Sequence, residues 1–353
     1  MNPIRVSLIG YGYVGKTFHA PLILAVEGLA LTVVGSSRPD HVHADLPQVR
    51  VCSFEEAAIA DDADLVVIAT PNTSHYPLAA AALEAGKHVV IDKPFTTTLA
   101  DARALVALAA KHNRLLSVFH NRRWDSEVLA TKAILESGRL GRVSHYECHM
   151  DRFRPLVRQR WRETPGEGAG LWFDLGPHLI DQCLFLFGLP ETITANIATL
   201  RNGGQTDDWA HTVLTYPGLR IVLNATLLAA GPGPRTIVHG TVATWIKYGA
   251  DTQEPQLQAG MSPTDPLFGI DPDPGILVDG ATGARTEIPA PRGLQQGFYE
   301  GLRDAILTGQ TPQLSGREAI AVMAILETTF ESARQGRTLS IPLTDEERTA
   351  WKN

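Results

Sequence analysis

The run IRVSLIGYGYVG, residues 4–15, decides the fold of this chain. Its first seven residues are mostly apolar and β-rich, as in a strand that is buried in a parallel sheet. Three glycines follow with the spacing G-x-G-x-x-G and open a predicted helix. Such glycines permit a tight turn and let backbone N–H groups approach a pyrophosphate at the helix N-terminus. The residues of this predicted nucleotide loop are Gly10, Tyr11, Gly12, Tyr13, Val14 and Gly15.

Glycines also punctuate ordinary turns, so the pattern around the motif has to decide between the two interpretations. Short apolar runs alternate with helical patterns as far as about residue 120. The strand-like runs are 29–37, 50–54, 63–70, 88–94 and 114–120, and the helical patterns include 75–87 and 99–113. This alternation predicts an α/β fold of the Rossmann type, with a doubly wound parallel sheet that binds ligands beyond the carboxyl ends of its strands.

A different pattern follows residue 122 and predicts a second domain. Its strand-like segments alternate and carry nearby turn signals, which indicates a largely antiparallel sheet. They are 144–153, 191–200, 209–217, 220–229 and 235–249, and the predicted helices are 125–137, 173–187, 296–308 and 316–335. The Pro/Gly-rich stretch 255–275 is predicted to be an extended loop. We therefore expect domains at 1–122 and 123–353.

Composition excludes several classes of protein. The 353 residues are 44% hydrophobic and 20% charged, with a formal net charge of −7 and no Lys/Arg block, so a nucleic-acid partner is not expected. The cysteines, Cys52, Cys148 and Cys183, lie too far apart for a disulfide framework or a metal site. The N-terminal sequence does not resemble a secretory signal, and no run is long enough to span a bilayer. We expect a cytoplasmic protein without a membrane partner.

The end of the second predicted strand bears on the choice of cofactor. An NAD site usually has an acidic residue there to hold the ribose hydroxyls. This chain has Ser36, Ser37 and Arg38, and two hydroxyls with a guanidinium suit a 2′-phosphate. The pattern favours NADP, although Asp40 lies nearby and leaves NAD possible.

Polar side chains follow three further strands, at the ends that would line the cofactor crevice. Each of these side chains could instead have a structural role only, as a helix cap, a solvated charge or a turn residue. Their coincidence at neighbouring strand ends favours a cofactor and active site. The fourth strand is followed by Thr70, Pro71, Asn72 and His75, the fifth by Asp92, Lys93 and Pro94, and the sixth by Asn121.

The second domain supplies another cluster, in GLWFDLGPHLID, residues 170–181. Asp174, His178 and Asp181 have the spacing i, i+4 and i+7, which places them on one helix face. That face could be an exposed polar surface or a metal site, but no further His, Cys or Glu completes a coordination shell, and we expect no metal. The pairs His41/His43 and His145/His149 are interpreted as structural or surface residues.

Five motifs together resemble the Gfo/Idh/MocA oxidoreductases over nearly the whole chain: GYGYVG, ATPNTSH, AGKHVVIDKP, HNRRW and GLWFDLGPHLID. Asp92 stands where many members have Glu. The resemblance implies a Rossmann domain and a C-terminal α/β domain with a large, mostly antiparallel open sheet, through which a homodimer or homotetramer would form. It also implies Lys93 as general acid/base, with Asp174 and His178 completing the catalytic set. Thr70, Pro71, Asn72, His75 and Asn121 would flank the nicotinamide and its ribose.

Three further segments are similar to the NADP-dependent scyllo-inositol dehydrogenase-like branch of that family. They are the SSR stretch after the second strand, 151–163 and 239–254. The similarity implies that Trp161 and Arg162 reach the cofactor, although a core tryptophan with a surface arginine would give the same pattern. The arginines at 152, 154, 158 and 160 suit an acidic or hydroxyl-rich substrate, or are simply solvated.

The predicted function is an NADP-dependent hydride transfer to or from a secondary alcohol of a cyclic polyol or sugar. Lys93 would take the hydroxyl proton, His178 would hydrogen-bond the reacting oxygen, and Asp174 would orient His178 or a substrate hydroxyl. The alternatives are the same machinery on another carbonyl or imine, an NADP(H)-sensing regulator, or a structural oligomer. A regulator would need no proton-transfer residues, and a structural role leaves the cofactor motifs unexplained.

Overall fold

The protein forms two compact units in a computed structural model that describes residues 2–231, 233–312, 314–349 and 351. The first unit comprises Met1–Asn121, Gln253–Phe268 and Leu294–Ile320, and the remaining segments form the second unit. The sequence prediction divided the chain once, at residues 122 and 123. In the structure two later segments return to the first unit, because their apolar side chains pack there, among them the fully buried Phe268 and Tyr299.

Within the described ranges, the first unit contains a six-stranded parallel sheet with the order β3-β2-β1-β4-β5-β6. The strand order reverses between β1 and β4, which is the topological switch point of a Rossmann fold. The predicted α/β fold is confirmed. The strands are β1 (Ile4–Ile9), β2 (Leu29–Gly35), β3 (Arg50–Cys52), β4 (Leu65–Ile68), β5 (His88–Ile91) and β6 (Leu116–Val118).

The helices of the first unit begin where the sequence supplies caps. The Ser53 hydroxyl accepts from the backbone of Glu56 while the Glu56 carboxylate accepts from the backbone of Ser53, a capping box that starts α3. Thr98 caps α5 by accepting from the backbone of Asp101. The helices are η1 (Gly15–His19), α1 (Ala20–Leu24), α2 (Pro39–His43), α3 (Phe54–Ala58), η2 (Asn72–Ser74), α4 (His75–Glu84), α5 (Leu99–Lys111), α8 (Gln253–Gln258) and α9 (Gly297–Thr308).

The predicted extended loop 255–275 is partly wrong, because its first four residues belong to α8. Pro255 lies in the first turn of α8, where backbone N–H groups make no hydrogen bond within the helix. The missing N–H of this proline therefore does not disturb the helix. The apolar Leu257 is buried and fixes the helix against the first unit.

In the described part of the chain, the second unit has a nine-stranded sheet with the order β14-β13-β12-β11-β7-β10-β9-β8-β15. Its neighbouring strands run antiparallel except for the parallel pair β7 and β10, so the predicted mostly antiparallel sheet is confirmed. The strands are β7 (Val143–Asp151), β8 (Thr192–Ala198), β9 (Trp209–Tyr216), β10 (Leu219–Thr226), β11 (Thr236–Gly240), β12 (Ala243–Lys247), β13 (Gly275–Asp279), β14 (Arg285–Ile288) and β15 (Leu339–Ser340).

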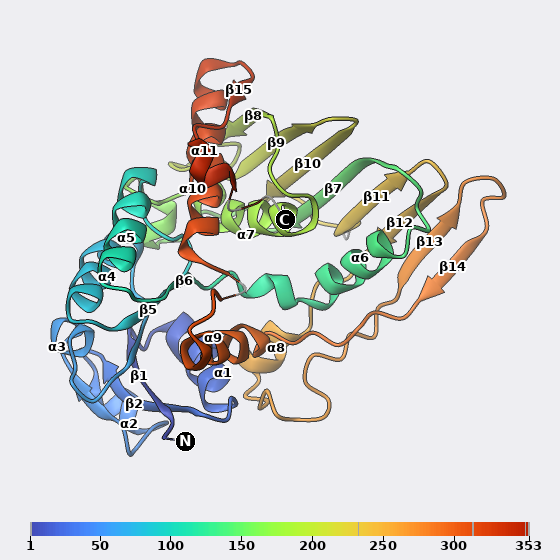
Figure 1. The fold of residues 1–353 in the computed structure, drawn as a ribbon. Coiled ribbons are helices and arrows are strands. Elements are labelled where there is room, and N and C mark those ends of the chain that lie inside the picture. The colour runs from blue at the N-terminus through green and yellow to red at the C-terminus, as the bar shows by residue number, and fades with distance from the viewer. Residues whose placement is uncertain (1, 232, 313, 350, 352–353) are drawn as a thin grey trace. The chain divides into compact units, whose positions relative to one another are not determined.

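Helix α7 (Leu171–Phe187) covers one face of this sheet and packs on β7, β9 and β10 (Figure 1). Burial alternates along β9 from Trp209 to Tyr216, because every second side chain points under α7 and the others point to the open face. The other helices of the unit are α6 (Ser126–Glu136), η4 (Trp161–Glu163) and α11 (Asp345–Thr349). Helix η3 (Asn121–Trp124) and helix α10 (Gly316–Gln335) run from the first unit into the second. No helix within the described ranges is both long and apolar enough to cross a membrane.

Candidate functional site

The nucleotide loop joins β1 to η1, and its glycines have different physical tasks. Gly10 has a φ of +97°, and a Cβ there would lie 2.5 Å from the carbonyl oxygen of Ala69. A Cβ at Gly15 would overlap the carbonyl oxygen of Gly10. Gly12 is exposed, and a Cβ there would meet nothing within 4 Å. Two glycines therefore close the turn on itself, while the third leaves an open backbone face that a ligand can approach.

The aromatic residues of the loop face in different directions. Tyr11 is buried, and its hydroxyl donates to Asp45 at 3.3 Å. Burial raises the pKa of Tyr11, and the Asp45 charge raises it further. The Asp45 carboxylate also pairs with Lys16 at 2.6 Å. Tyr13 is exposed and accepts a 2.5 Å hydrogen bond from Gln258 of α8. Tyr11 and Tyr13 thus tie the loop to its surroundings.

The residues after β2 are open to solvent. Ser36 is half-buried, and its hydroxyl accepts from the backbone N–H of Arg38 at 3.1 Å. Ser37, Arg38 and Asp40 are exposed. Hydroxyl, guanidinium and carboxylate groups are therefore all accessible at this strand end, where a nucleotide ribose is expected.

Strands β4 and β5 are hydrogen-bonded neighbours, and His75 joins the segments that follow them. Its Nδ1 lies 2.9 Å from the Pro94 carbonyl oxygen and its Nε2 lies 3.0 Å from the Thr70 carbonyl oxygen. Burial lowers the pKa of the ring, although the Asp92 charge opposes that effect. The neutral ring donates to one carbonyl at a time, and it fixes the two strand ends to each other. A simple exposed helix cap is excluded because His75 is fully buried.

The segment after β5 is not a solvated charged turn. Asp92 is only 6% exposed, Lys93 is half-buried, and the Lys93–Pro94 peptide is cis. Burial alone would raise the pKa of the Asp92 carboxyl, but the interaction with His19 and the charges of Lys93 and His75 outweigh it, so its pKa lies below the usual value. Asp92 is therefore a carboxylate at neutral pH.

The other strand-end residues are distributed along the same edge of the first sheet. Thr70 is half-buried and its hydroxyl accepts from Ser74 at 2.7 Å. Pro71 is exposed, while Asn72 and Asn121 are buried. Because parallel strands end at one edge, β1, β2, β4, β5 and β6 deliver the predicted cofactor residues of the first unit there.

The predicted residues of the second unit lie on α7 and η4. The Asp174 carboxylate pairs with Arg162 Nε at 3.4 Å, and the Arg162 guanidinium stacks 4.6 Å from the ring centre of Trp161. Trp161 is 43% exposed, so it is not the core tryptophan of the alternative interpretation. His178 is buried. Lys93 belongs to the first unit, and Asp174 and His178 belong to the second.

Asp181, the third residue of the predicted helix face, has a structural partner. Its carboxylate accepts two hydrogen bonds from Arg123 Nε, at 3.0 and 3.1 Å, and one from Nη2 at 2.7 Å. Both side chains are buried, and the Arg123 guanidinium lies 5.2 Å from the ring centre of Phe185. The interpretation of this helix face as an exposed polar surface is therefore wrong at Asp181.

Asp174 lies in a pocket that is rich in arginine. The pocket is lined by charged side chains from four segments of the second unit, namely Arg152, Arg154, Arg160, Arg162, Glu163, Asp174, Arg201 and Asp207. Of the arginines singled out in the sequence, Arg158 does not line it. Arg201 and Asp207 could not be predicted from the sequence, because Arg201 bonds to Arg154 and Asp207 to Trp172, which lie far from them along the chain.

Asp207 caps the N-terminus of α7 and requires a glycine at position 170. Its carbonyl and carboxylate oxygens accept from the backbone N–H groups of Leu171 and Trp172 at 2.9 and 2.6 Å, which satisfies two donors of the helix N-terminus. A Cβ at Gly170, whose φ is +99°, would overlap the Asp207 carboxylate. The missing side chain of Gly170 therefore leaves room for the Asp207 carboxylate.

The pKa of Asp207 provides a test of this cap. Burial raises it to about 6, against an ordinary value of 3.8, although the hydrogen bonds from the helix N-terminus lower it. The folded unit therefore holds a proton that the unfolded chain releases, and this stabilisation is present below about pH 4 and lost as the pH rises through about 6. In urea titrations, the free energy of unfolding of wild type relative to Asp207→Asn should fall by on the order of 2 kcal/mol between about pH 4 and 7. An unchanged difference would contradict the assignment.

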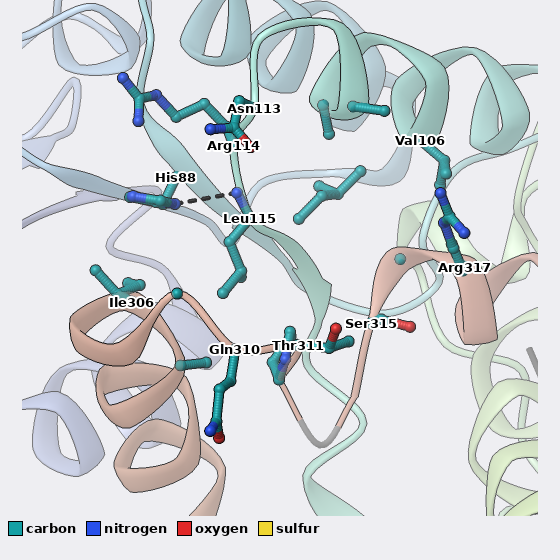
Figure 2. A pocket seen from close by; sticks show the side chains of 17 residues that line it. His88, Val106, Asn113, Arg114, Leu115, Ile306, Gln310, Thr311, Ser315 and Arg317 are labelled. Carbon is teal, nitrogen blue, oxygen red and sulfur yellow. Dashed lines mark hydrogen bonds between the residues drawn. The ribbon is translucent and has the colours of Figure 1, made fainter. Parts of the chain in front are cut away.

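A pocket of about 700 Å³ in the first unit lies at the other end of the sheet (Figure 2). It adjoins His88, which begins β5, and Leu116, which begins β6. His88 Nδ1 accepts from the backbone N–H of Leu115 at 3.0 Å, as the dashed line shows. Because the predicted cofactor residues follow the carboxyl ends of the strands, this pocket is not part of the candidate site.

Two family models match the chain, one for each predicted domain. The NAD-binding Rossmann fold of an oxidoreductase family matches residues 4–120, and the C-terminal alpha/beta domain of the same family matches residues 132–342. The chain belongs to the Gfo/Idh/MocA oxidoreductase family. The resemblance that the five motifs indicated is confirmed, and the chain is an oxidoreductase by family.

Relatives in the Gfo/Idh/MocA family match over nearly the whole chain. The uncharacterized oxidoreductase YdgJ of Escherichia coli is 48% identical over 96% of this chain and 99% of its own. The scyllo-inositol 2-dehydrogenase (NADP(+)) IolW of Bacillus subtilis is 36% identical over 97% of each chain. The crystal structure of a candidate oxidoreductase from Klebsiella pneumoniae has a TM-score of 0.94 at 49% identity, over 100% of this chain and 99% of that one.

Metal ligands were one alternative for the histidine and aspartate residues of this Gfo/Idh/MocA chain. Among the residues that the structure describes, no group of three or more His, Cys, Asp and Glu side chains is arranged to hold a metal ion. His145 and His149 instead contact Glu147 at 2.7 and 3.0 Å on the open face of β7.

Proposed function

We propose that the protein is an NADP-dependent oxidoreductase that transfers a hydride between the nicotinamide and a secondary alcohol of a cyclic polyol or sugar, with Lys93 as general acid/base. The observation that carries the proposal is the position of Lys93, half-buried beside a carboxylate at the end of β5, on the same sheet edge as the open backbone of Gly12. A nucleotide bound at that edge lies beyond the strand ends.

The loop geometry fits a dinucleotide. The exposed backbone at Gly12 can receive a pyrophosphate at the start of η1, since nothing lies where a side chain would point. The groups after β2 support the phosphorylated form, because Ser36, Ser37 and Arg38 can hold a 2′-phosphate that a carboxylate would repel. The NADP dependence of IolW, a relative over nearly its whole length, supports the same assignment.

Arg38 provides a test of cofactor preference. Because its exposed guanidinium would contact only the 2′-phosphate, Arg38→Ala is expected to weaken NADP binding by roughly 10- to 100-fold while leaving NAD binding unchanged. Calorimetric titration of both nucleotides measures this. The control is Arg50→Ala, which removes an exposed arginine of β3 that pairs with Asp62. Equal binding of NAD and NADP by the wild type would overturn the NADP assignment.

The chemistry divides between the cofactor and the chain. NADP⁺ supplies the hydride acceptor and leaves the proton of the alcohol to be removed. Lys93 accepts that proton, and the Asp92 carboxylate stabilises the charged ammonium that results. From the second unit, His178 hydrogen-bonds the reacting oxygen and Asp174, paired with Arg162, orients a substrate hydroxyl. Thr70, Pro71, Asn72, His75 and Asn121 flank the nicotinamide and its ribose, and Trp161 and Arg162 reach the cofactor.

A substrate panel tests the reaction type. Inositols, aldoses and sugar lactones are offered with NADP⁺ or NAD⁺, and the absorbance of the reduced cofactor is followed. Turnover of a cyclic polyol or aldose is the expected result, in line with IolW and with the D-glucoside 3-dehydrogenase of Escherichia coli, which is 27% identical over 59% of this chain. If NADP binds but neither these nor other carbonyl or imine substrates react, the chain is a nucleotide-binding regulator instead.

We also propose that the open face of the larger sheet pairs with a second copy of the chain, as a homodimer or homotetramer in the cytoplasm. The face carries half-buried apolar side chains at Trp209, Val213, Val222, Ile237 and Ile246, which a partner would cover. Light scattering at several concentrations gives the mass. Val213→Asp, at the centre of β9, is expected to shift it toward the monomer.

A further inference from the structure

A buried polar contact path leads from α9 to the carboxylate beside Lys93. The Tyr299 hydroxyl lies 2.5 Å from His19 Nδ1, and His19 Nε2 lies 3.5 Å from Asp92 Oδ1. Tyr299 and His19 are fully buried and Asp92 nearly so. The three residues come from α9, η1 and the end of β5, and all belong to the first unit.

The proton positions along this path follow from the charges. The pKa of Tyr299 is raised by burial and by the negative charge of Asp92, so the hydroxyl keeps its proton and donates it to Nδ1. With Nδ1 accepting from Tyr299, the N–H of the His19 ring lies on Nε2, which faces the Asp92 carboxylate. The opposite tautomer would turn a lone pair toward Asp92. Tyr299 therefore selects the histidine tautomer that attracts Asp92.

Aromatic packing fixes the path in place. The His19 ring lies 4.2 Å from the ring of Phe119, measured between centres, and Phe119 contacts Tyr299 and Phe298 at 5.7 and 4.9 Å. Residues held this tightly have few alternative rotamers. Within the described residues, the acceptor that faces the fully buried Nε2 of His19 is Asp92.

A purely structural role accounts poorly for this arrangement. Stability alone would be served as well by apolar side chains of similar volume, because replacing a buried ionic contact by well-packed hydrophobic residues is often neutral or stabilising. The charged and titratable groups that face Asp92 are His19, Lys93, His75 and Tyr299. His19 contacts this carboxylate and the Lys93 charge acts on it, so a side chain that holds His19 in place also influences how strongly Asp92 acts on Lys93.

We propose that His19 and Tyr299 are positioning residues that orient the Asp92 carboxylate and thereby set the proton affinity of the Lys93 amine. The inference rests on the proposed role of Lys93 in proton transfer. Neither residue touches the reacting atoms; each acts through Asp92. When His19 is lost, Asp92 no longer has that partner, and its charge favours the ammonium form of Lys93 more strongly.

The first test removes one hydroxyl. Tyr299→Phe keeps the ring packing and is expected to lower kcat about tenfold, with NADP affinity unchanged, because the histidine tautomer is no longer fixed. The acidic limb of the kcat/KM profile should move to higher pH. His19→Ala should show the same changes, and His19→Gln should restore part of the rate since its amide can donate to Asp92. The matched control is Tyr216→Phe in the second unit, which removes a buried tyrosine hydroxyl bonded to the Gly188 carbonyl.

Coupling to Lys93 separates positioning from stability. In a Lys93→Met background, Tyr299→Phe should lower the residual kcat no further, because its effect passes through Lys93. A loss of stability would lower the melting temperature in both backgrounds alike. Wild-type kcat and pH profile in Tyr299→Phe and His19→Ala, with Lys93→Met inactive, would overturn this inference and leave the proposed function intact.

A measurement without substrate tests the positioning even if Lys93 is not the acid–base group. The rate at which an N-hydroxysuccinimide acetate reagent acylates Lys93 is measured by mass spectrometry at several pH values. Acylation requires the neutral amine, so Tyr299→Phe and His19→Ala should slow it severalfold relative to wild type and Tyr216→Phe. If Lys93→Met remains active but acylation slows, the proposed function fails and the positioning survives. Unchanged acylation in both variants would overturn the positioning itself.

Discussion

Replacing Lys93 by methionine is expected to lower turnover by at least ~10²–10⁴-fold, which is the usual contribution of a positioned acid–base group. Methionine has a similar length and fills the half-buried space without a titratable group. NADP affinity should change little, because the residues predicted to hold the nucleotide phosphates follow β1 and β2 rather than β5. Steady-state assays with the best substrate of the panel, together with calorimetric NADP titration, measure both quantities.

The control for that variant is Lys87→Met, which removes the lysine just before β5, whose amine donates to the Ala63 carbonyl at 2.9 Å. It should keep wild-type turnover. His178→Ala is expected to be about as damaging as Lys93→Met, since the buried ring would contact the reacting oxygen. Near-normal turnover in Lys93→Met would contradict the acid–base assignment whatever the effect at His178.

Arg123→Met should produce the largest loss of stability among the substitutions considered. It leaves the Asp181 carboxylate buried without the three hydrogen bonds from the guanidinium, and breaking a buried pair in this way typically costs about 3–5 kcal/mol. Urea titration followed by circular dichroism measures the free energy of unfolding.

Two comparisons show whether that loss comes from the unpaired charge. The double variant Arg123→Met/Asp181→Leu should recover much of the stability, because no buried charge remains. Arg50→Met breaks a pair with Asp62 at 2.6 Å that is nearly half exposed, and it should cost less than about 1 kcal/mol. Equal losses for Arg50→Met and Arg123→Met would show that burial does not govern the strength of the pair.

The sequence predicted the first unit more completely than the second. Strands β1, β4 and β5 at the centre of the parallel sheet are almost wholly buried on both faces, so each stands out in the sequence as a nearly continuous apolar run. In the second unit, the alternation predicts one segment over 235–249, but the chain turns after Gly240 and forms the hairpin of β11 and β12. Strand β14 was missed because its side chains are mostly exposed and give no alternation, and β15 has only two residues.

In the candidate site, residues that lie close together in the sequence could be predicted, but contacts between residues far apart along the chain could not. Motifs within a few residues of one another, such as Asp92, Lys93 and Pro94, could be predicted because they follow one strand. The i, i+4, i+7 spacing on α7 could not show that Asp181 pairs with an arginine 58 positions earlier. Asp207 and Arg201 escaped notice for the same reason, since their partners are gathered by folding rather than by spacing.

The return of the chain to its first unit has a consequence for synthesis on the ribosome. The buried Tyr299 and the Leu314 carbonyl, which accepts from Ser117 at 2.6 Å, are made long after β1 to β6. A nascent chain that has only passed residue 122 still exposes the apolar surface around Phe119 that α9 covers. The nucleotide-binding unit is therefore complete only once residue 320 has emerged, and a fragment that stops at the predicted domain boundary would be aggregation-prone.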